Sequence, residues 1–561
     1  MTQRKGGPAA TGWDRATIAL AVVFVLLVAG IAVYVLVEFP PQSASPTSPP
    51  TPPGVVPRGP PANANLTPPT ALPVLLTDGR LGVDVRADQR LDSQDAAAIN
   101  TTGARMVRWP GGALGDRFDP LGDSDAGTIY TVNGTSVSPA TSYPEFVSWC
   151  GWVRCQSIVT LPAEIDNATL AAAIVSYSVH TLHFFPTYWE IGNEPLMWTH
   201  FGIPWTSWNL TQDVVARPSS FASLVQSYVA SIRSVDPTTP ILGIGGVGAG
   251  GSQSTWITDD VATNGPNLTG VAIHVYPAGN INGPEPPTTW LASLQSGSAL
   301  PTRVNSTLSE VNATCPTCHL DVLADELGTG TLVPQGDEIT GGYLATYVSA
   351  EILQSLPLRL ASADYYNLES ETPGAWFSPS GAPSPAYFAY SNWAEQVGSY
   401  AAPLGVSSKA TGLLAAVGGA SAGTLTNLIL VNVNTSFTFS LNLSKDFADV
   451  AEASILTWNG SSGSPSNLTW GPAGPTNLTV PPMSLAILSN VGASGALDRP
   501  LSSGHREGPH QGIPIPLRTE SRLAPTVLSR FGGLTSTGIA REPSLAAPAL
   551  PARGIRTRGP G

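Results

Sequence analysis

The stretch YWEIGNEP, at residues 188–195, decides the fold prediction. A short apolar run leads directly into a carboxylate, Glu194, and Pro195 then ends any strand. A second stretch, DVLADELG at residues 321–328, has the same plan, with Glu326 shortly before a glycine. Because the carboxyl ends of parallel strands meet at one edge of a sheet, the two stretches predict a pair of carboxylates at one rim of a parallel sheet.

Six further apolar runs, with helical patterns between them, extend this plan along the chain. The candidate strands span residues 81–85, 105–109, 157–161, 188–191, 241–244, 271–275, 320–324 and 364–368. Between the fourth and fifth runs, apolar residues from Phe221 to Ile232 recur at helical spacing, between Pro218 and Pro237. Eight strands alternating with helices predict an α/β fold, a (β/α)8 TIM barrel over residues 74–397.

The chain after the barrel has a different pattern. Short β-rich runs such as LTNLILVNVN and MSLAILSN are separated by Gly, Ser and Asn, which predicts a C-terminal β-sandwich accessory domain over residues 398–492. Residues 493–561 are rich in Gly, Pro, Ser and Arg without periodicity, and we expect them to form a disordered tail.

The N-terminal part is expected to anchor the chain in a membrane. Residues 17–37 are uncharged and mostly apolar, which suffices for one transmembrane helix through roughly 30 Å of hydrocarbon. Arg4, Lys5 and Arg15 precede this segment, so residues 1–16 should be cytoplasmic and the rest extracytoplasmic. Residues 38–73 are dense in Pro, Ser and Thr and are expected to be an extended stalk. A cleaved signal peptide is the alternative interpretation of the apolar segment.

Glycosylation sequons and charge bear on the same topology. Thirteen of the 23 asparagines begin an Asn-x-Ser/Thr triplet, where about four are expected from the Ser and Thr content, and all thirteen follow the apolar segment. This excess indicates an exported glycoprotein, although Asn-Ser/Thr turns in loops are an alternative.

The net charge is -13, and residues 1–492 hold 17 basic against 35 acidic residues, which argues against nucleic acid as a partner.

The four cysteines form two local pairs, Cys150 with Cys155 and Cys315 with Cys318. In an extracytoplasmic protein these pairs predict two disulfides. Four thiolates could instead hold zinc, but the pairs are far apart in sequence and no other ligands surround them. The sequence has no metal-ligand cluster, phosphate loop or Ser-His-Asp order, so neither a metal nor a cofactor is expected.

Two more motifs lie on predicted strands. RWPGG, at residues 108–112, ends the second strand, and HVY, at residues 274–276, ends the sixth, where alternation places His274 and Tyr276 on one face. In this order and spacing, RWPGG, WEIGNEP, HVY and ADELG resemble the clan A retaining glycoside hydrolases. The similarity is to heparanase-like and β-glucuronidase-like members (family 79) or to related arabinofuranosidase-like and xylosidase-like members. It covers roughly residues 74–490.

The resemblance implies a role for each motif. Glu194 is the expected acid/base, Asn193 the donor to the sugar 2-hydroxyl, and Glu326 the nucleophile. Arg108 is expected beside the nucleophile, and the hydroxyl of the H-x-Y tyrosine is expected to contact it. The supporting residues are therefore Asn193, Arg108, His274 and Tyr276. The acid/base must hold a proton at first, so we expect burial and the nucleophile's charge to raise its pKa.

Other interpretations of these residues stay open. Asp325 could be the functional acid in place of Glu326, and Glu194 could be a structural carboxylate. Glu190 competes for the acid role, but it precedes Glu194 by four residues and should lie deeper in the barrel, paired. Arg108 could serve only to bridge barrel carboxylates, and a lone core histidine is commonly structural.

Aromatic residues follow two of these strands. Their flat faces suit the C–H faces of sugars, so they are expected to wall a binding cleft, with plain packing as the alternative. The candidates are Trp198, Trp205, Trp208, Trp376 and Phe377.

Together these features predict a membrane-held retaining glycoside hydrolase that cleaves extracellular polysaccharide or glycoconjugate by two-carboxylate double displacement. A catalytically silent glycan-binding or cell-envelope protein on the same fold is the alternative. A transglycosylase with the same two carboxylates is another.

Overall fold

The computed structural model describes residues 61–488, except residues 70, 78, 123–125, 131–135, 197, 199–216, 247–253, 278–286, 297–298, 330–341, 371–373, 444–453, 460–465 and 470–476. The predicted cytoplasmic segment, transmembrane anchor and disordered tail, most of the predicted stalk, and Trp205 and Trp208 lie outside these residues. Among the described helices, none combines the length and the apolar character needed to cross a bilayer.

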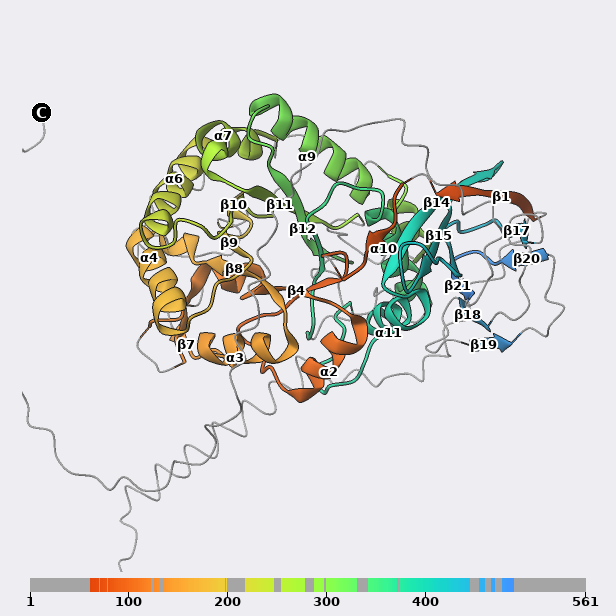
Figure 1. The fold of residues 1–561 in the computed structure, drawn as a ribbon, viewed down its shortest axis with the longest axis horizontal. Coiled ribbons are helices and arrows are strands. Elements are labelled where there is room, and N and C mark those ends of the chain that lie inside the picture. Colours follow the sequence, from red (N-terminus) through yellow and green to blue (C-terminus); the bar gives the residue numbers. More distant parts are fainter. Residues whose placement is uncertain are drawn as a thin grey trace, which may run out of the picture. The chain divides into compact units, whose positions relative to one another are not determined.

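Eight parallel strands close into a barrel (Figure 1). In chain order they are β3 (Gly82–Asp84), β4 (Met106–Trp109), β8 (Gln156–Leu161), β9 (Tyr188–Ile191), β10 (Ile241–Ile244), β11 (Gly270–Val275), β12 (Asp321–Leu327) and β13 (Ser362–Tyr365). Each predicted strand is found, so the TIM barrel is confirmed. Strand β12 continues beyond its predicted end because its parallel pairing with β11 carries on to Leu327, and this register sets His274 beside Glu326.

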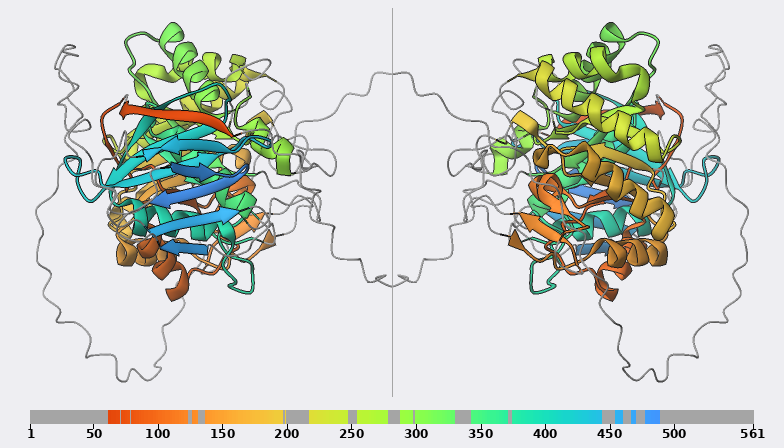
Figure 2. Two further views of the ribbon diagram at one scale, coloured as in Figure 1. Left: turned by 90° about the vertical axis from the view of Figure 1, so that its right-hand side faces the viewer. Right: turned by 90° about the vertical axis from the view of Figure 1, so that its left-hand side faces the viewer.

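Helices cover the outside of the barrel, as the right-hand view of Figure 2 shows for the orange to green elements. They are α2 (Ser93–Thr102), α3 (Tyr143–Val153), α4 (Ala168–Ser176), α6 (Pro218–Val235), α7 (Ser254–Asn264), α8 (Pro287–Ser293), α9 (Leu300–Thr314), α10 (Gly342–Ser355) and α11 (Pro385–Asn392). Helix α6 begins at the predicted proline and buries the predicted apolar stripe.

An insertion follows β4. A 3-10 helix, η1 (Gly112–Arg117), leads into a small antiparallel sheet of β5 (Phe118–Asp119), β6 (Thr128–Tyr130) and β7 (Ser136–Val137). Trp109 stacks on Tyr143 and Phe146 of α3, which holds this end of β4 against the helix layer.

The second domain is rich in strands, as predicted. It contains β1 (Ala62–Pro69), β2 (Val74–Leu75), β14 (Tyr400–Ser408), β15 (Leu413–Gly419), β16 (Asn427–Asn432), β17 (Phe439–Asn442), β18 (Ser454–Asn459), β19 (Ser466–Thr469), β20 (Asn477–Val480) and β21 (Ser484–Leu488). These ten strands form one continuous sheet, shown in the left-hand view of Figure 2, so the predicted strand-rich accessory domain is present but is built from a single sheet. Strand β1 joins the halves by pairing antiparallel with β14 and parallel with β17.

The sheet doubles over on itself. Leu430 of β16 and Leu441 of β17 are separated by three strands in the sheet, yet they belong to one buried apolar cluster. Strand β1 also corrects the predicted stalk, residues 38–73. Residues 62–69 form a strand in which buried and exposed positions alternate, and this strand pairs with both β14 and β17.

Alternation along the strands explains how the sheet attaches to the barrel. On β16, Leu428 and Leu430 face the interior of the doubled sheet, whereas Ile429 and Val431 belong to the barrel's core cluster. Helix α10 packs against β21, which shares this division. Both faces of the central strands are therefore buried.

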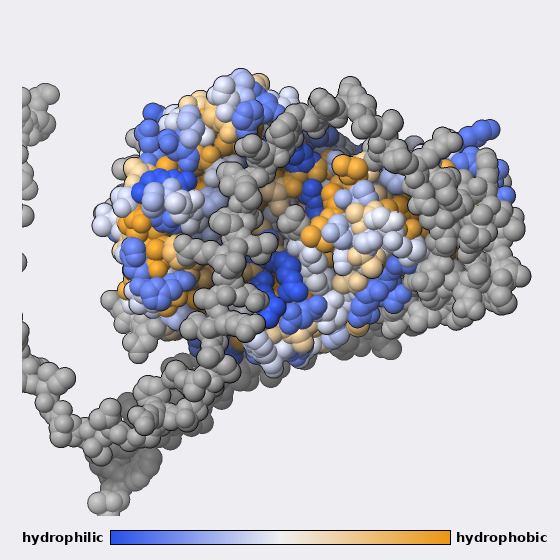
Figure 3. Space-filling view, viewed as in Figure 1, coloured by the Kyte–Doolittle hydropathy of each residue, from blue (hydrophilic) through white to orange (hydrophobic). Residues whose placement is uncertain are grey.

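Apolar side chains are mostly inside. Among the described residues the large exposed ones are Leu72, Leu121, Val137, Trp152, Phe185 and Phe437. On the face shown in Figure 3, hydrophilic and hydrophobic residues are interspersed. Isolated apolar residues of this kind are normal for a protein surface.

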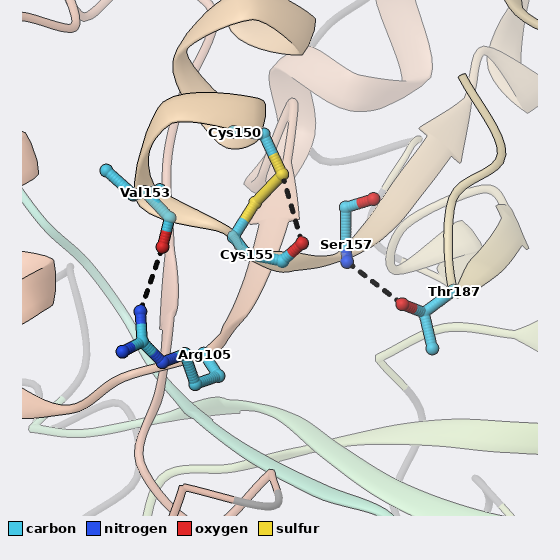
Figure 4. Close-up of a disulfide and its surroundings, with 6 residues drawn as sticks. All are labelled: Arg105, Cys150, Val153, Cys155, Ser157 and Thr187. Carbon is cyan, nitrogen blue, oxygen red and sulfur yellow. Dashed lines mark hydrogen bonds between the residues drawn. A yellow bond between two sulfur atoms is a disulfide. The ribbon is translucent and has the colours of Figure 1, made fainter. Parts of the chain in front are cut away.

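Both predicted disulfides are present, Cys150–Cys155 and Cys315–Cys318. The first closes the turn between α3 and β8 (Figure 4). Beside it, Arg105 donates to the Val153 carbonyl at 2.8 Å. All four sulfurs are bonded in pairs, so the zinc alternative is excluded.

Candidate active site

The charged residues of the predicted site lie at the carboxyl ends of the barrel strands. Strand β4 supplies Arg108, β9 supplies Glu190, and the turn after β9 supplies Asn193 and Glu194. Four further residues come from the neighbouring strand ends: Asp84, His274, Asp325 and Glu326. The structure thus brings together the two predicted carboxylates and their predicted partners at the rim where TIM-barrel sites form.

Arg108 is fully buried and bonds four carboxylates. It forms two bonds with Glu190, Nε–Oε2 at 2.7 Å and Nη2–Oε1 at 3.0 Å. Its Nη1 lies 2.7 Å from Glu326 Oε1 and 3.3 Å from Asp84 Oδ1, and its Nε lies 3.2 Å from Asp325 Oδ2. Arg108 therefore bridges barrel carboxylates and also lies beside Glu326, so the two interpretations of this residue hold together.

Both carboxylate oxygens of Glu326 accept hydrogen bonds. Oε1 accepts from Arg108, and Oε2 accepts from the Tyr276 hydroxyl at 2.6 Å. His274 Nδ1 also lies 3.1 Å from Oε2. The two side chains of the HVY motif thus point to one carboxylate, as the strand alternation predicts.

Glu194 lies on a tight turn and remains partly open to solvent. Its φ is +44°, its N–H donates to the Gly245 carbonyl at 3.0 Å, and its Oε1 lies 2.8 Å from His274 Nδ1. Its side chain is 25% exposed, against 5% for Glu326. Gly246, at φ +82°, leaves room for this pair, because a Cβ there would lie 2.5 Å from Glu194 Cγ.

The spacing of the two candidate carboxylates is short. One oxygen of Glu194, one oxygen of Glu326 and a ring nitrogen of His274 all lie within 4.8 Å of one another. Three such ligand atoms could also hold a metal ion. However, the Arg108 guanidinium bonds Glu326 at 2.7 Å and would repel a cation there.

Burial divides the carboxyls around Arg108 into two groups. Burial raises the pKa of Asp84 and of Asp325 well above the ordinary range, although Arg108 opposes the shift in both. Burial would also raise the pKa of Glu190, but the Arg108 charge and several hydrogen bonds outweigh it and hold this pKa low. Asp325 therefore tends to carry a proton, which disfavours the prediction that it replaces Glu326.

The pKa of Glu194 corrects one prediction. We expected it to be raised, but although burial acts in that direction, the charge and hydrogen bond of His274 and then the charge of Arg108 lower it. The sequence did not reveal that His274 lies 2.8 Å away. Tyr276 is different, since burial and the Glu326 charge raise its pKa well above its ordinary range and keep the phenol protonated as a donor.

The remaining predicted residues have distinct positions. Asn193 is buried and its Oδ1 accepts from Arg108 at 2.7 Å, which leaves the amide NH2 as its group for a sugar hydroxyl. The prediction that Trp198 and Trp376 wall a cleft is wrong. Both are buried: Trp198 packs on Phe221, and Trp376 packs on Tyr390. Both residues follow barrel strands closely in sequence, and their apolar rings pack into the core instead of facing a cleft.

Several residues of the site were not predicted. Thr160 donates to Glu190 at 2.6 Å, and its place at the end of the third strand was the available signal. Tyr366 is a second unpredicted tyrosine of the site, and burial and then the charge of Glu326 raise its pKa. Asp116, from η1, accepts from the Asn193 N–H at 2.7 Å, and nothing in its local sequence indicates this contact.

No model of a known protein family and no curated protein matches the sequence. Solved structures do match. The GH51 arabinofuranosidase from Xanthomonas axonopodis pv. citri has a TM-score of 0.58 at 13% identity, covering 76% of this chain and 99% of its own. CelM2, a bifunctional glucanase-xylanase from a metagenome library, has a TM-score of 0.55 at 14% identity, covering 78% and 100%.

A GH family 44 xyloglucanase from Paenibacillus polymyxa is also similar, with a TM-score of 0.54, 12% identity and coverage of 76% and 99%. At such identities the likeness is one of fold. The arabinofuranosidase family belongs to clan A and has a TIM barrel, so the predicted resemblance to the clan A glycoside hydrolases is confirmed at the level of the fold.

A buried acid next to the Arg108 network should make stability depend on pH. Burial raises the pKa of Asp364 to about 8, and Ser362 donates to it. The unfolded chain releases this proton near pH 4, so the folded state binds one more proton between about pH 4 and 8 and stability falls as pH rises through this window. D364N should make the fall in unfolding free energy shallower in urea titrations across this range. The exposed control E395Q should not change the slope, and equal slopes for D364N and wild type would contradict the assignment.

Proposed function

We propose that this protein is a retaining glycoside hydrolase with Glu194 as acid/base and Glu326 as nucleophile. The observation that carries the proposal is the spacing, since one oxygen of Glu194 lies within 4.8 Å of one oxygen of Glu326. Retaining enzymes place their carboxyls about 5 to 5.5 Å apart, whereas inverting enzymes need about 6.5 to 9.5 Å to admit a water. The short distance favours direct attack by one carboxylate.

In the first step Glu326 attacks the anomeric carbon, and the bond to the leaving oxygen breaks as Glu194 gives that oxygen a proton. Arg108 and Tyr276 donate to the two oxygens of Glu326, which orients the carboxylate for attack. The products of this step are the free alcohol and a glycosyl ester on Glu326. Asn193 lies next to Glu194 and can donate to the sugar 2-hydroxyl.

In the second step Glu194 removes a proton from water, the water attacks the anomeric carbon and the ester to Glu326 breaks. Two displacements at one carbon restore its configuration. Glu194 regains a proton at each cycle, and its Oε1 lies 2.8 Å from His274 Nδ1.

The structural neighbours support this proposal, because their names describe an arabinofuranosidase, a glucanase-xylanase and a xyloglucanase. We infer that the substrate is a carbohydrate joined by an O-glycosidic bond, from an extracellular polysaccharide or glycoconjugate. The rival function is a silent glycan-binding protein. The complete carboxylate pair, with every predicted partner around it, favours the enzyme.

Replacing each of the two carboxylates should change the rate of hydrolysis in a different way. Wild type is expected to hydrolyse one member of a panel of aryl glycosides, and E326A should lose at least about 10³-fold in kcat on every leaving group. E194A should lose little on a dinitrophenyl glycoside in the first step, and added azide should restore turnover by replacing the water that needs a base. Wild-type rates in both variants, measured by release of the phenol, would falsify the assignment.

The pH profile tests the partnership of Glu194 with His274. The charge and hydrogen bond of His274 lower the pKa of Glu194 more than the Arg108 charge does, so without His274 burial is opposed by Arg108 alone and this pKa should rise. H274Q should therefore keep the acid protonated to higher pH and move the basic limb of the kcat/KM profile upwards. Y276F removes a contact with Glu326 alone and should lower kcat with the basic limb in place. If the basic limb of the kcat/KM profile lay at the same pH in H274Q as in wild type, a group other than the Glu194–His274 pair would set it.

We further propose that residues 17–37 hold the enzyme on the outer side of a membrane, with the catalytic domain glycosylated. The structure gives the burial of eight sequon asparagines: seven are exposed, and Asn434 is half-buried. Exposed asparagines are accessible to a glycosyltransferase.

After carbonate extraction, the full chain should stay in the membrane pellet, whereas a chain without residues 1–60 should be found in the supernatant. Enzymatic removal of N-glycans should lower the apparent mass of both. A full chain in the soluble fraction would contradict the anchor, and an unchanged mass would contradict glycosylation.

A further inference from the structure

The turn that carries Glu194 has an unusual backbone. Gly192 has a φ of +77° and Glu194 a φ of +44°, so two of three consecutive residues lie in the left-handed region. Glycine adopts this region freely, but glutamate does so at a cost and needs support from its surroundings. The Glu194 N–H, which donates to the Gly245 carbonyl at 3.0 Å, supports one side of the turn.

Asp116 supports the other side. It is buried in η1, and its Oδ1 accepts from the Asn193 N–H at 2.7 Å. Its Oδ2 accepts from Trp198 Nε1 at 2.9 Å, and the same indole donates to the Asn193 carbonyl at 2.8 Å. One carboxyl thus ties the residue before the acid/base to a buried tryptophan four residues after it.

Packing leaves this turn little freedom to move. A Cβ on Gly192 would lie 2.9 Å from the Ala163 Cβ and 3.4 Å from Asp116 Oδ1. Trp198 contacts Phe221 of α6 edge to face, with ring centroids 5.9 Å apart. The carboxyl of Asp116 therefore connects the turn to Trp198 and, through the contact of Trp198 with Phe221, to α6.

We propose that Asp116 is a positioning residue for the acid/base: it holds the Gly192–Glu194 turn so that Glu194 reaches the leaving oxygen. The inference rests on the proposed function and deepens it. Within the described residues, Asp116 forms no hydrogen bond with Glu194 or Glu326, and its two oxygens accept from the Asn193 N–H and the Trp198 indole. Its effect should therefore appear only where protonation of the leaving group matters.

D116N is the direct variant because it keeps the shape of the side chain. An amide has one acceptor oxygen, so its NH2 must face either the Asn193 N–H or the Trp198 indole N–H. D236N is the matched control. Asp236 accepts from the Trp189 indole at 3.3 Å and from the backbone N–H of Thr239 at 3.0 Å. Trp189 lies near the start of β9, whereas Glu194 follows the end of that strand.

The test compares two substrates of the sugar that wild type hydrolyses, one with an alkyl leaving group and one with a dinitrophenyl leaving group. D116N should lose about 10²-fold in kcat on the alkyl glycoside and about threefold or less in the first step on the dinitrophenyl glycoside. W198F, which removes the indole N–H together with part of the ring, should show the same preference for loss on the alkyl glycoside. D236N should change both rates equally. Equal losses on both substrates in D116N, or no loss on either, would overturn the proposal.

Hydrogen exchange gives a readout that needs no activity. In D116N the peptide covering residues 188–195 should exchange faster than in wild type, and in D236N the acceleration should be confined to the Thr238 and Thr239 region. Unchanged exchange of residues 188–195 in D116N would contradict the positioning role. If wild type hydrolysed no glycoside at all, the proposed function would fail, while the exchange result would still decide whether Asp116 holds the turn.

Discussion

The buried Arg108 guanidinium is the interaction on which the site depends. Four carboxyls from three other strands meet at this one cation, and removing it would take away the counter-charge that they share in the buried interior. Breaking such a buried network costs about 3 to 5 kcal/mol. The guanidinium that neutralises the acidic interior also bonds Glu326, so one residue both stabilises the barrel and holds the proposed nucleophile. This explains why both interpretations of Arg108 hold.

The fold could be read from sequence because it rests on repeated local signals. All eight strands appear as short apolar runs, and α6 shows its stripe from Phe221 to Ile232 between two prolines. The second domain was harder. Its strands are visible individually, but β1 comes from a Pro-rich stretch more than 300 residues before β14 and β17, and its pairing with them is a long-range event that no local pattern reports. The single doubled sheet therefore differs from the expected sandwich.

The site shows the same division. Motifs at strand ends identified Glu194, Glu326, Arg108 and Tyr276, because barrel topology brings strand ends together. What the motifs could not supply was the environment of each side chain. His274 lowers the pKa of Glu194 where burial alone would raise it, and the tryptophan expected in a cleft wall, Trp198, is buried against Asp116. Such contacts depend on packing between segments distant in sequence.

The central claim is that Glu326 attacks the sugar directly, which the short distance between the two carboxylates favours. Its most direct test is the stereochemistry of the first product, followed by proton NMR at early times with an aryl glycoside that the enzyme cleaves. The account predicts that the free sugar first appears with the anomeric configuration of the substrate and only later equilibrates. Initial appearance of the opposite anomer would mean that water attacks in a single displacement, and would contradict the account.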